Sequence, residues 1–441
     1  MQPVFRIARA LQVVLTTAAN RIAKSSGAIQ RERKFTGASL AQTFVFGWLN
    51  NPWATLDELA QMAACCGTAV SPQAIGQRLT SKLADFFKQL LEVATAEVVT
   101  SHAMASELLQ RFRGVYLQDS TVIGLPDSFA QEYPGCGGGT GEKSAALKLQ
   151  VQLNLANGHI NGPFPEAGKA SDRASRVQHL TLPAGALRIA DLGYFDLSVL
   201  AKMAANMVFW ISRIQVPTAV FHAGKQLDVC SWLDKQHVHS TDLSIELGAS
   251  ERLGCRLLAI RCPAEVVRRR IASLEKDARR RGRTPSKAQR RWCHWTIVVT
   301  NVPADRLNLI EAMVLYRARW QIELLFKLWK QHGLVDESRH QADAAKLVEI
   351  YAKLIGLVIQ HWLLITTIWS YSNRSLTKAS KAIRKHVMLL VAAFQSLITI
   401  QAAIEQITQA LRKSARINHR KRKPNTHQIL ENPELLGYDL A

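Results

Sequence analysis

The spacing of apolar residues predicts helices over the first hundred residues of the chain. Residues 1–35 interleave apolar residues with seven Arg and Lys residues, which is typical of an amphipathic helix. This stretch has neither the compact apolar core nor the cleavage site of a signal peptide. From residue 39 to about residue 101 the apolar period remains helical. Residues 1–105 are therefore predicted to form a helical N-terminal region.

Part of this region has the pattern of a helix-turn-helix. Thr55 is a predicted helix cap, and Glu58 three residues later completes a capping box. Gly67 ends this helix, and Ser71-Pro72 begins a second one that is predicted to continue to residue 83. Two helices at this spacing can bind DNA, but any helical hairpin has the same pattern. Both interpretations remain open.

The period changes after Arg113, where short apolar runs predict strands with a helix between them. Residues 147–155 alternate with a period of two, which is the clearest strand pattern in the chain. The elements predict an α/β core over residues 106–214. The predicted strands cover residues 114–117, 147–155, 187–190 and 208–214, and the predicted helix covers residues 197–206.

A second region, residues 215–304, combines short strands with a strongly basic helical stretch. The strands are predicted at residues 243–247, 256–260 and 296–300, and the segment 265–291 carries a net charge of +8. Helices are predicted from about Leu307 to the end of the chain. We divide this part into residues 305–370, the last part of the core, and residues 371–441, a basic C-terminal region. Two apolar runs here, 354–369 and 387–404, contain polar residues and are predicted to be buried core helices rather than membrane spans.

The charge of the whole chain indicates the kind of partner. Among 441 residues, 56 Lys and Arg face 34 Asp and Glu, a formal net charge of +22. Such an excess favours a polyanionic partner, most simply nucleic acid, with an anionic membrane surface as the alternative. Seven cysteines without metal-ligand spacing favour a reducing cytosol.

Two aspartates follow short apolar strands and are candidates for a metal site. Asp119 is expected to end the strand that begins at residue 114, and Asp191 directly follows the strand 187–190. Open α/β sheets place their sites at the carboxyl ends of strands. Carboxylates at neighbouring strand ends can hold divalent metals, although a single aspartate there can also be a cap or turn residue. Asp127 and Asp196 rank below these two.

A later helix is expected to present cations, a carboxylate and a tyrosine on one face. On a continuous helix the side chains fall within an arc of about 60°, with Lys327 beside them. A solvated face with an Arg–Glu ion pair is the alternative interpretation. The residues of this face are Tyr316, Arg319, Glu323 and Lys330.

The spacing Tyr-x2-Arg-x3-Glu-x6-Lys resembles the signature around the catalytic glutamate of bacterial insertion-sequence DDE transposases. Asp119 and Asp191 resemble the first and second catalytic aspartates of that family. The resemblance covers about residues 40–425. It implies an α/β fold, namely a ribonuclease-H-like catalytic core with a β-rich insertion, flanked by helical N- and C-terminal regions. Leu192 departs from the arginine that often follows the second aspartate in the family.

The resemblance also implies a chemistry. Two divalent ions per site, Mg²⁺ or Mn²⁺, would be held by Asp119, Asp191 and Glu323, and the enzyme would cut transposon ends and join a 3′-OH to target DNA. In the hairpin-forming branch of the family a tryptophan at the place of Trp295 stacks on a flipped base; a core tryptophan is the alternative here. Arg319 and Lys330 would bind phosphates, with Tyr316 donating a hydrogen bond and Lys327 lying beside them.

The resemblance further implies a homodimer that binds two terminal inverted repeats of double-stranded DNA. The expected location is the bacterial cytoplasm, in association with the nucleoid. A metal-dependent nuclease on the same core and an inactive DNA-binding regulator are the alternatives. The glycine-rich residues 135–144 lack the glycine that a phosphate loop needs before Lys143, and His222, His237 and His239 lack zinc-ligand spacing.

Overall fold

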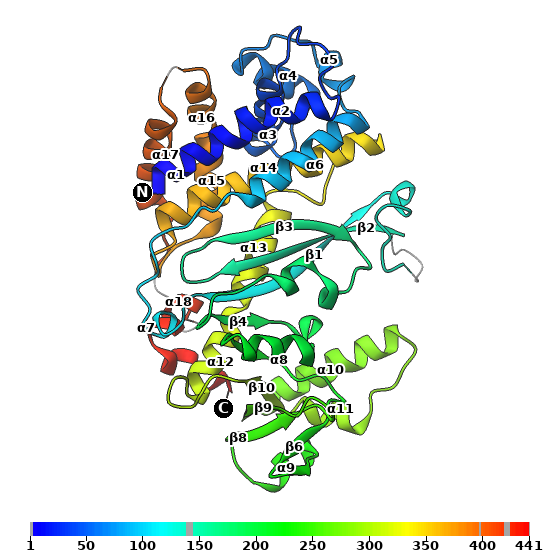
Figure 1. Cartoon of the computed structure of the whole chain (residues 1–441), viewed down its shortest axis with the longest axis vertical. Helices are drawn as coiled ribbons and strands as arrows, with labels where there is room; N and C mark the ends of the chain where they lie inside the picture. Colours follow the sequence, from blue (N-terminus) through cyan, green and yellow to red (C-terminus); the bar gives the residue numbers. More distant parts are fainter. Residues whose placement is uncertain (1–2, 138–143, 397, 419–423, 441) are drawn as a thin grey trace. The chain divides into compact units, whose positions relative to one another are not determined.

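The computed structural model describes residues 3–137, 144–396, 398–418 and 424–440 (Figure 1). The chain forms two compact units, each assembled from three separate segments. Unit 1 consists of Met1–Ala105, Asp119–Ala170 and Ile322–Asn418, and unit 2 consists of Ser106–Gln118, Ser171–Gln321 and His419–Ala441. The glycine-rich segment that resembles a phosphate loop falls mainly on residues outside the described ranges, as do four cations of the C-terminal tail.

Within the described residues the strands form a ten-stranded sheet in the order β3-β2-β1-β4-β5-β10-β9-β8-β6-β7. Strand β4 pairs in parallel with both β1 and β5, whereas β2–β3, β5–β10, β10–β9 and β9–β8 are antiparallel. The observed architecture is therefore mixed α/β with helical flanks, as predicted. The strands are β1 (Val115–Leu125), β2 (Ala145–Asn154), β3 (Ile160–Ala167), β4 (Leu187–Ala190), β5 (Phe209–Ser212), β6 (Val220–His222), β7 (Lys225–Gln226), β8 (Ser240–Leu247), β9 (Leu253–Arg261) and β10 (Trp295–Thr300).

Strand β1 is longer than the sequence predicts. Asp119 was expected to end this strand, but β1 continues to Leu125, so that expectation is wrong. After Asp119 the chain still favours a strand because Val122 and Gly124 are exposed while Ile123 and Leu125 are buried. Strand β1 pairs with β4 as far as Gln118.

Unit 1 is built around one long apolar helix. Helix α14 packs against α3, α6 and α17, and Figure 1 shows it beside α6. The helices of this unit are α1 (Pro3–Gln12), α2 (Ala19–Ser25), α3 (Gly37–Asn50), α4 (Leu56–Cys65), α5 (Pro72–Gly76), α6 (Ser81–Ala96), α14 (Asp343–Ile368), α15 (Leu376–Lys385), α16 (Val387–Phe394) and α17 (Ile400–Ser414), together with nearly all of α13 (Trp320–Gln331).

Helix α14 is long and apolar enough to cross a membrane, with a mean hydropathy of 1.5 over its most apolar window. All of that window is buried inside the protein, which confirms the prediction of a buried core helix for residues 354–369. The second apolar run, residues 387–404, is divided between α16 and α17. Buried polar contacts join α14 to the preceding loop: Lys353 Nζ donates to the carbonyls of Leu334 and Glu337 at 2.8 and 2.9 Å. Lys353 also forms an ion pair of 2.6 Å with Glu349 on the same helix.

The predicted helix-turn-helix is only partly formed. The capping box of Thr55 and Glu58 begins α4 as predicted, and Gly67 follows the end of that helix with a φ of +81°. The second helix is shorter than expected: α5 ends at Gly76, and Thr80 caps the separate helix α6. A glycine followed by a threonine that caps a new helix favours two helices over one. The predicted second helix of the motif is therefore only five residues long. DNA contact by this region stays a prediction.

Unit 2 contains the parallel strands and the segment predicted as a β-rich insertion. Residues 215–304 form strands β6 to β10 and three helices, so the segment is mixed rather than mainly strand. Trp210, Leu257 and Val299 belong to the apolar core of unit 2. The helices of unit 2 are α7 (Glu107–Gln110), α8 (Leu197–Ala205), α9 (Val229–Lys235), α10 (Ala264–Arg280), α11 (Lys287–Trp292), α12 (Leu309–Ala318) and α18 (Thr426–Glu431).

Candidate active site

The carboxyl end of β4 in unit 2 carries the first group of candidate residues. Asp191 directly follows β4 and precedes a short 3-10 turn, whose N–H groups its side chain does not cap. Arg213 directly follows β5, and the parallel register pairs Ile189 of β4 with Ile211 of β5. Asp191 and Arg213 therefore directly follow neighbouring parallel strands. Each lies two residues after the paired Ile189 and Ile211. Asp196, ranked below Asp191 from the sequence, is occupied as the cap of α8.

Tyr316 and Arg319 belong to the same group of side chains in unit 2. The Arg319 guanidinium makes a hydrogen bond with the Tyr316 side chain. Burial raises the pKa of Tyr316 to about 12; the positive charges of Arg213 and Arg319 oppose this shift, and the negative charge of Asp191 adds to it. The tyrosine hydroxyl thus stays protonated at neutral pH and can donate a hydrogen bond. Arg213 was not predicted as a site residue. Its position near the end of the predicted strand 208–214 could have indicated it.

The helix that carries the predicted signature is interrupted. Tyr316 lies on α12, which ends at Ala318, and Glu323 lies on α13. The Arg319 N–H donates to the Tyr316 carbonyl three residues back, so the hydrogen-bond ladder tightens from α to 3-10 spacing there. The prediction of one uninterrupted helix is therefore wrong, because Arg319 separates α12 from α13, although Arg319 keeps helical dihedral angles. On α13 itself, Glu323, Lys327 and Lys330 share a face within about 60°.

Unit 1 contains the second group of candidate residues. Asp119 lies within β1, and its Oδ1 accepts a hydrogen bond of 2.9 Å from the N–H of Ser120. Lys330 of α13 donates from Nζ to the carbonyl oxygen of Val122, also on β1, at 2.8 Å. Glu323 is half-buried on α13, and Lys327 is exposed. An ammonium group has three N–H donors, so Lys330 keeps donors for a phosphate after binding β1.

The three predicted metal ligands are divided between the units. Asp119 and Glu323 belong to unit 1, and Asp191 belongs to unit 2. Within the described residues, no three His, Cys, Asp or Glu side chains form a group that could hold a metal ion.

A buried polar network lies beside the strands that carry Asp119 and Asp191. Arg188 of β4 is 2 % exposed and donates hydrogen bonds to the side-chain carbonyls of Gln118 and Gln178. These amides donate in turn to the carbonyls of Val177, at 2.6 Å, and Tyr194, at 3.1 Å. Burial lowers the pKa of Arg188 to about 10. We did not predict this network, although an arginine inside a four-residue apolar strand was its visible signal.

Trp295 lies in the core of unit 2. Its side chain is 2 % exposed, belongs to the apolar cluster of this unit and donates from Nε1 to Asp234 Oδ1 at 3.4 Å. A base could stack on this ring only after the ring had left its cluster. The placement matches the alternative interpretation, a core tryptophan at the start of a strand. Trp320, next to Arg319, is 53 % exposed instead.

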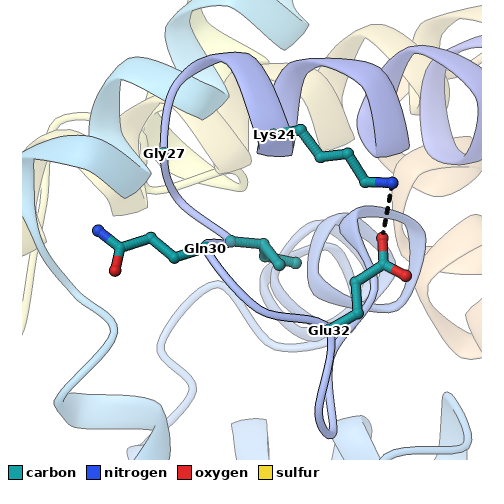
Figure 2. A pocket seen from close by; sticks show the side chains of 5 residues that line it. Lys24, Gly27, Gln30 and Glu32 are labelled. Carbon is teal, nitrogen blue, oxygen red and sulfur yellow. Dashed lines mark ion pairs between the residues drawn. The ribbon is translucent and has the colours of Figure 1, made fainter.

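A surface pocket of about 590 Å³ lies at the end of α2 in unit 1, away from every predicted site residue in the sequence (Figure 2). Lys24 and Glu32 form an ion pair of 3.2 Å in it, and the Gln30 side chain points away from this pair. Both charged side chains are largely exposed, so water screens their interaction. The pocket holds no buried polar group that would select a ligand.

Comparison with known proteins identifies the class to which this arrangement belongs. The transposase DDE domain family matches residues 110–359, more than half of the chain. The chain is 25 % identical to the transposase for insertion sequence element IS231F of Bacillus thuringiensis subsp. israelensis, over 93 % of this chain and 91 % of the relative. It is 27 % identical to the IS231E transposase of B. thuringiensis subsp. finitimus, over 91 % and 90 %. It is 23 % identical to the IS1151 transposase of Clostridium perfringens, over 79 % and 78 %.

The chain therefore belongs to the transposase DDE domain family, and it is a bacterial insertion-sequence transposase, an enzyme that acts on DNA. The family resemblance and the DNA partner predicted from the sequence are confirmed at this level. Domains of this family generally depend on divalent metal ions.

Proposed function

We propose that Asp119, Asp191 and Glu323 are the three catalytic carboxylates of this transposase. The observation that carries the proposal is the register of β1 and β4, whose last pair of neighbours is Gln118 and Ala190. The next residue after each member of this pair is an aspartate: Asp119 continues β1 and Asp191 directly follows β4. Chain connectivity therefore favours two carboxylates beside one another. Glu323 completes the set through the Tyr316, Arg319, Glu323, Lys330 spacing.

The chemistry of these donors fits divalent cations. Three carboxylates supply only hard oxygen ligands, which suit Mg²⁺ or Mn²⁺ and disfavour soft metals. Two such ions, when bound, would activate the attacking oxygen and neutralise charge on the leaving oxygen of an in-line displacement at phosphorus. The role of Asp119, Asp191 and Glu323 is to hold these cations, and therefore each must be ionised.

The surrounding cations and the tyrosine would hold the DNA strand. Arg319 has a planar fork that suits two phosphate oxygens, and Lys330 and Lys327 add point charges from α13. Tyr316, protonated at neutral pH, would donate a hydrogen bond to a phosphate. We add Arg213 to this group because it ends β5 and because its charge acts on Tyr316.

The proposed reaction has two kinds of step. A water oxygen attacks phosphorus at the transposon end, and the 3′ oxygen leaves as a 3′-OH. This 3′-OH then attacks phosphorus of the opposite strand, which forms a DNA hairpin, and after the hairpin is opened it attacks target DNA. In the hydrolytic steps a P–O bond to the water oxygen forms as the P–O3′ bond breaks, and the leaving oxygen takes a proton. In the transfer steps one phosphodiester forms as another breaks and releases a 3′-OH, so no oxidant or reductant is needed.

The architecture supports this proposal at the level of fold. We infer that β3-β2-β1-β4-β5 is the ribonuclease-H-like part, because an antiparallel β2–β3 hairpin accompanies the parallel strands β1, β4 and β5. Residues 215–304 are then an insertion before the glutamate, between core segments 106–214 and 305–370, with helical regions 1–105 and 371–441 outside it. A homodimer acting on two terminal inverted repeats, in the nucleoid of the bacterial cytoplasm, is part of the same proposal.

The test is cleavage of a DNA duplex that ends in the element's inverted repeat. D119N, D191N and E323Q should each abolish Mg²⁺-dependent cleavage and leave binding of the duplex intact. D196N, which alters an aspartate used as a helix cap, is the matched control and should still cut. Cleavage retained by any of the first three variants would remove that residue from the site. A free cut without joining of the 3′ end would identify a nuclease instead.

A further inference from the structure

The exposed face of α10 carries cations that form no ion pair within the described part of the chain. Arg268, Lys276, Arg279 and Arg280 are all exposed. None of the four makes an ion pair with the residues that the structure describes, although Glu265 lies within 4.0 Å of Arg269 and Glu275 lies within 3.2 Å of Arg290. The two nearby glutamates are thus already paired with other arginines.

Helix α10 is fixed to unit 2 by its opposite face. Arg270 donates from Nη1 to the carbonyl of Trp295 and from Nη2 to the hydroxyl of Thr296, both at 2.9 Å. Val267 is buried, and Ile271 and Leu274 are partly buried. Because the apolar stripe already packs against the protein, it is not available to insert into a membrane, as the apolar face of an interfacial helix would.

The four cations share one side of the helix. At 100° per residue they fall within an arc of about 120°, and from Arg268 to Arg280 they extend along about 18 Å of helix. Each strand of a duplex carries one phosphate charge per about 3.4 Å of axis, so a helix of this length would span about five phosphates of one strand. Within this arc the one carboxylate is Glu265, which is paired with Arg269. The face offers arginine and lysine but no asparagine or glutamine, which favours contact with phosphates over reading of bases.

The helix tolerates repulsion that a bound anion would relieve. Lys276 lies three residues before Arg279 and four before Arg280, and like charges at these spacings destabilise a helix. The helix dipole rewards cations in the last turn, which accounts for Arg279 and Arg280. It does not account for Arg268 or Lys276, which lie earlier on α10.

We propose that the outward face of α10, made by Arg268, Lys276, Arg279 and Arg280, binds the phosphate backbone of duplex DNA without sequence preference. The inference depends on the proposed function only in taking DNA as the substrate. It adds a second DNA contact that is separate in sequence from the carboxylates and the signature residues.

The salt dependence of binding tests this surface. Binding of the full-length protein to a duplex of random sequence is measured across salt concentrations for the wild type, for R268Q/K276Q/R279Q and for a control. Loss of three phosphate contacts should reduce the slope of log K against log salt by about 2.7. The affinity advantage of the wild type should then shrink roughly 40-fold between 50 and 200 mM salt.

The control removes the same charge from other elements of unit 2. K202Q/K225Q/K235Q replaces three exposed lysines on α8, on β7 and on α9, and it should keep the wild-type slope. An equal change in both triple variants, or no change in either, would overturn the proposal. If the α10 triple variant lost its helical circular dichroism, R268Q alone, with an expected slope change of about 0.9, would decide the question.

Cleavage measured in parallel separates this inference from the proposed function. At low salt the α10 variant should still cut a duplex bearing the inverted repeat, because no carboxylate is altered. Failure of the wild type to cut with Mg²⁺ would count against the proposed chemistry while leaving the binding result unaffected.

Discussion

Arg188 of β4 donates a hydrogen bond from its buried guanidinium to the side-chain carbonyl of Gln118 on β1. Gln118 precedes Asp119, and Arg188 lies three residues before Asp191. Gln178 accepts from the same guanidinium, and described carboxylates form no ion pair with it. The guanidinium also lies 5.9 Å from the centre of the Tyr194 ring and 4.0 Å from Met203 Sδ, and the charge of Asp196 acts on it. A buried cation without a paired carboxylate is costly, so its presence beside these two strands indicates a positioning role.

Replacing Arg188 should therefore weaken both folding and cleavage. R188M leaves the two amide oxygens without their donor, at a cost of about 1–3 kcal/mol each in the free energy of unfolding. R188K keeps the charge but not the planar fork, and it should recover only part of the stability. Urea unfolding gives the stability, and the Mg²⁺ concentration for half-maximal cleavage gives the positioning effect. An R188M protein with wild-type stability and an unchanged Mg²⁺ requirement would contradict this role.

Lys330 and its neighbour Lys327 offer a matched pair on one face of α13. K330Q removes the bond to the Val122 carbonyl, and we expect a loss of about 0.5–1.5 kcal/mol in stability together with weaker binding of end DNA. K327Q alters an exposed cation and should weaken DNA binding while leaving the unfolding transition unchanged. Thermal unfolding and duplex binding are measured for both. Equal stability of the two variants would show that the bond to β1 contributes nothing to folding.

The elements with strong local signals were predictable from the sequence. The helix cap at Thr55, the strand before Asp191 and the buried apolar helix around residues 354–368 each depend on neighbouring residues in the chain, and each is present. The roles of Tyr316, Arg319, Glu323 and Lys330 stay predictions that depend on their spacing in the sequence.

Features that depend on partners distant in sequence were not predictable. The extension of β1 beyond Asp119 depends on strand pairing and burial. The network of Arg188 joins side chains up to 70 residues apart. Likewise, the sequence could not show whether Trp295 offers its ring to solvent or packs in the core.

Substitution of Trp295 separates a structural role from a role on DNA. W295A removes a buried indole, and truncation of this size costs about 3–5 kcal/mol. W295F keeps most of the apolar volume but loses the donor to Asp234, so it should lose less stability. Unfolding is measured first, and nicking and hairpin formation are then compared at a temperature where both variants are folded. A folded W295F that nicks normally but forms no hairpin would support base stacking despite the burial observed here.

Acid should destabilise unit 1 through His361 of α14. Its Nε2–H group bonds the carbonyl of Gly158 at 2.7 Å, and the ring is 3 % exposed. Burial lowers the pKa of His361 to about 4, with the charges of His159 and Arg374 acting in the same direction. Between pH 6.5 and about 4 the unfolded chain binds the proton and the folded chain does not, so stability falls as the pH falls through this range. The loss is on the order of 3 kcal/mol at its largest.

H361Q can donate to Gly158 without titrating, and its free energy of unfolding should depend less on pH than that of the wild type. If the wild type and H361Q lost stability equally as the pH fell, the acid sensitivity would belong to other groups. The nearest candidate is His159, which is partly buried and whose pKa is lowered by burial.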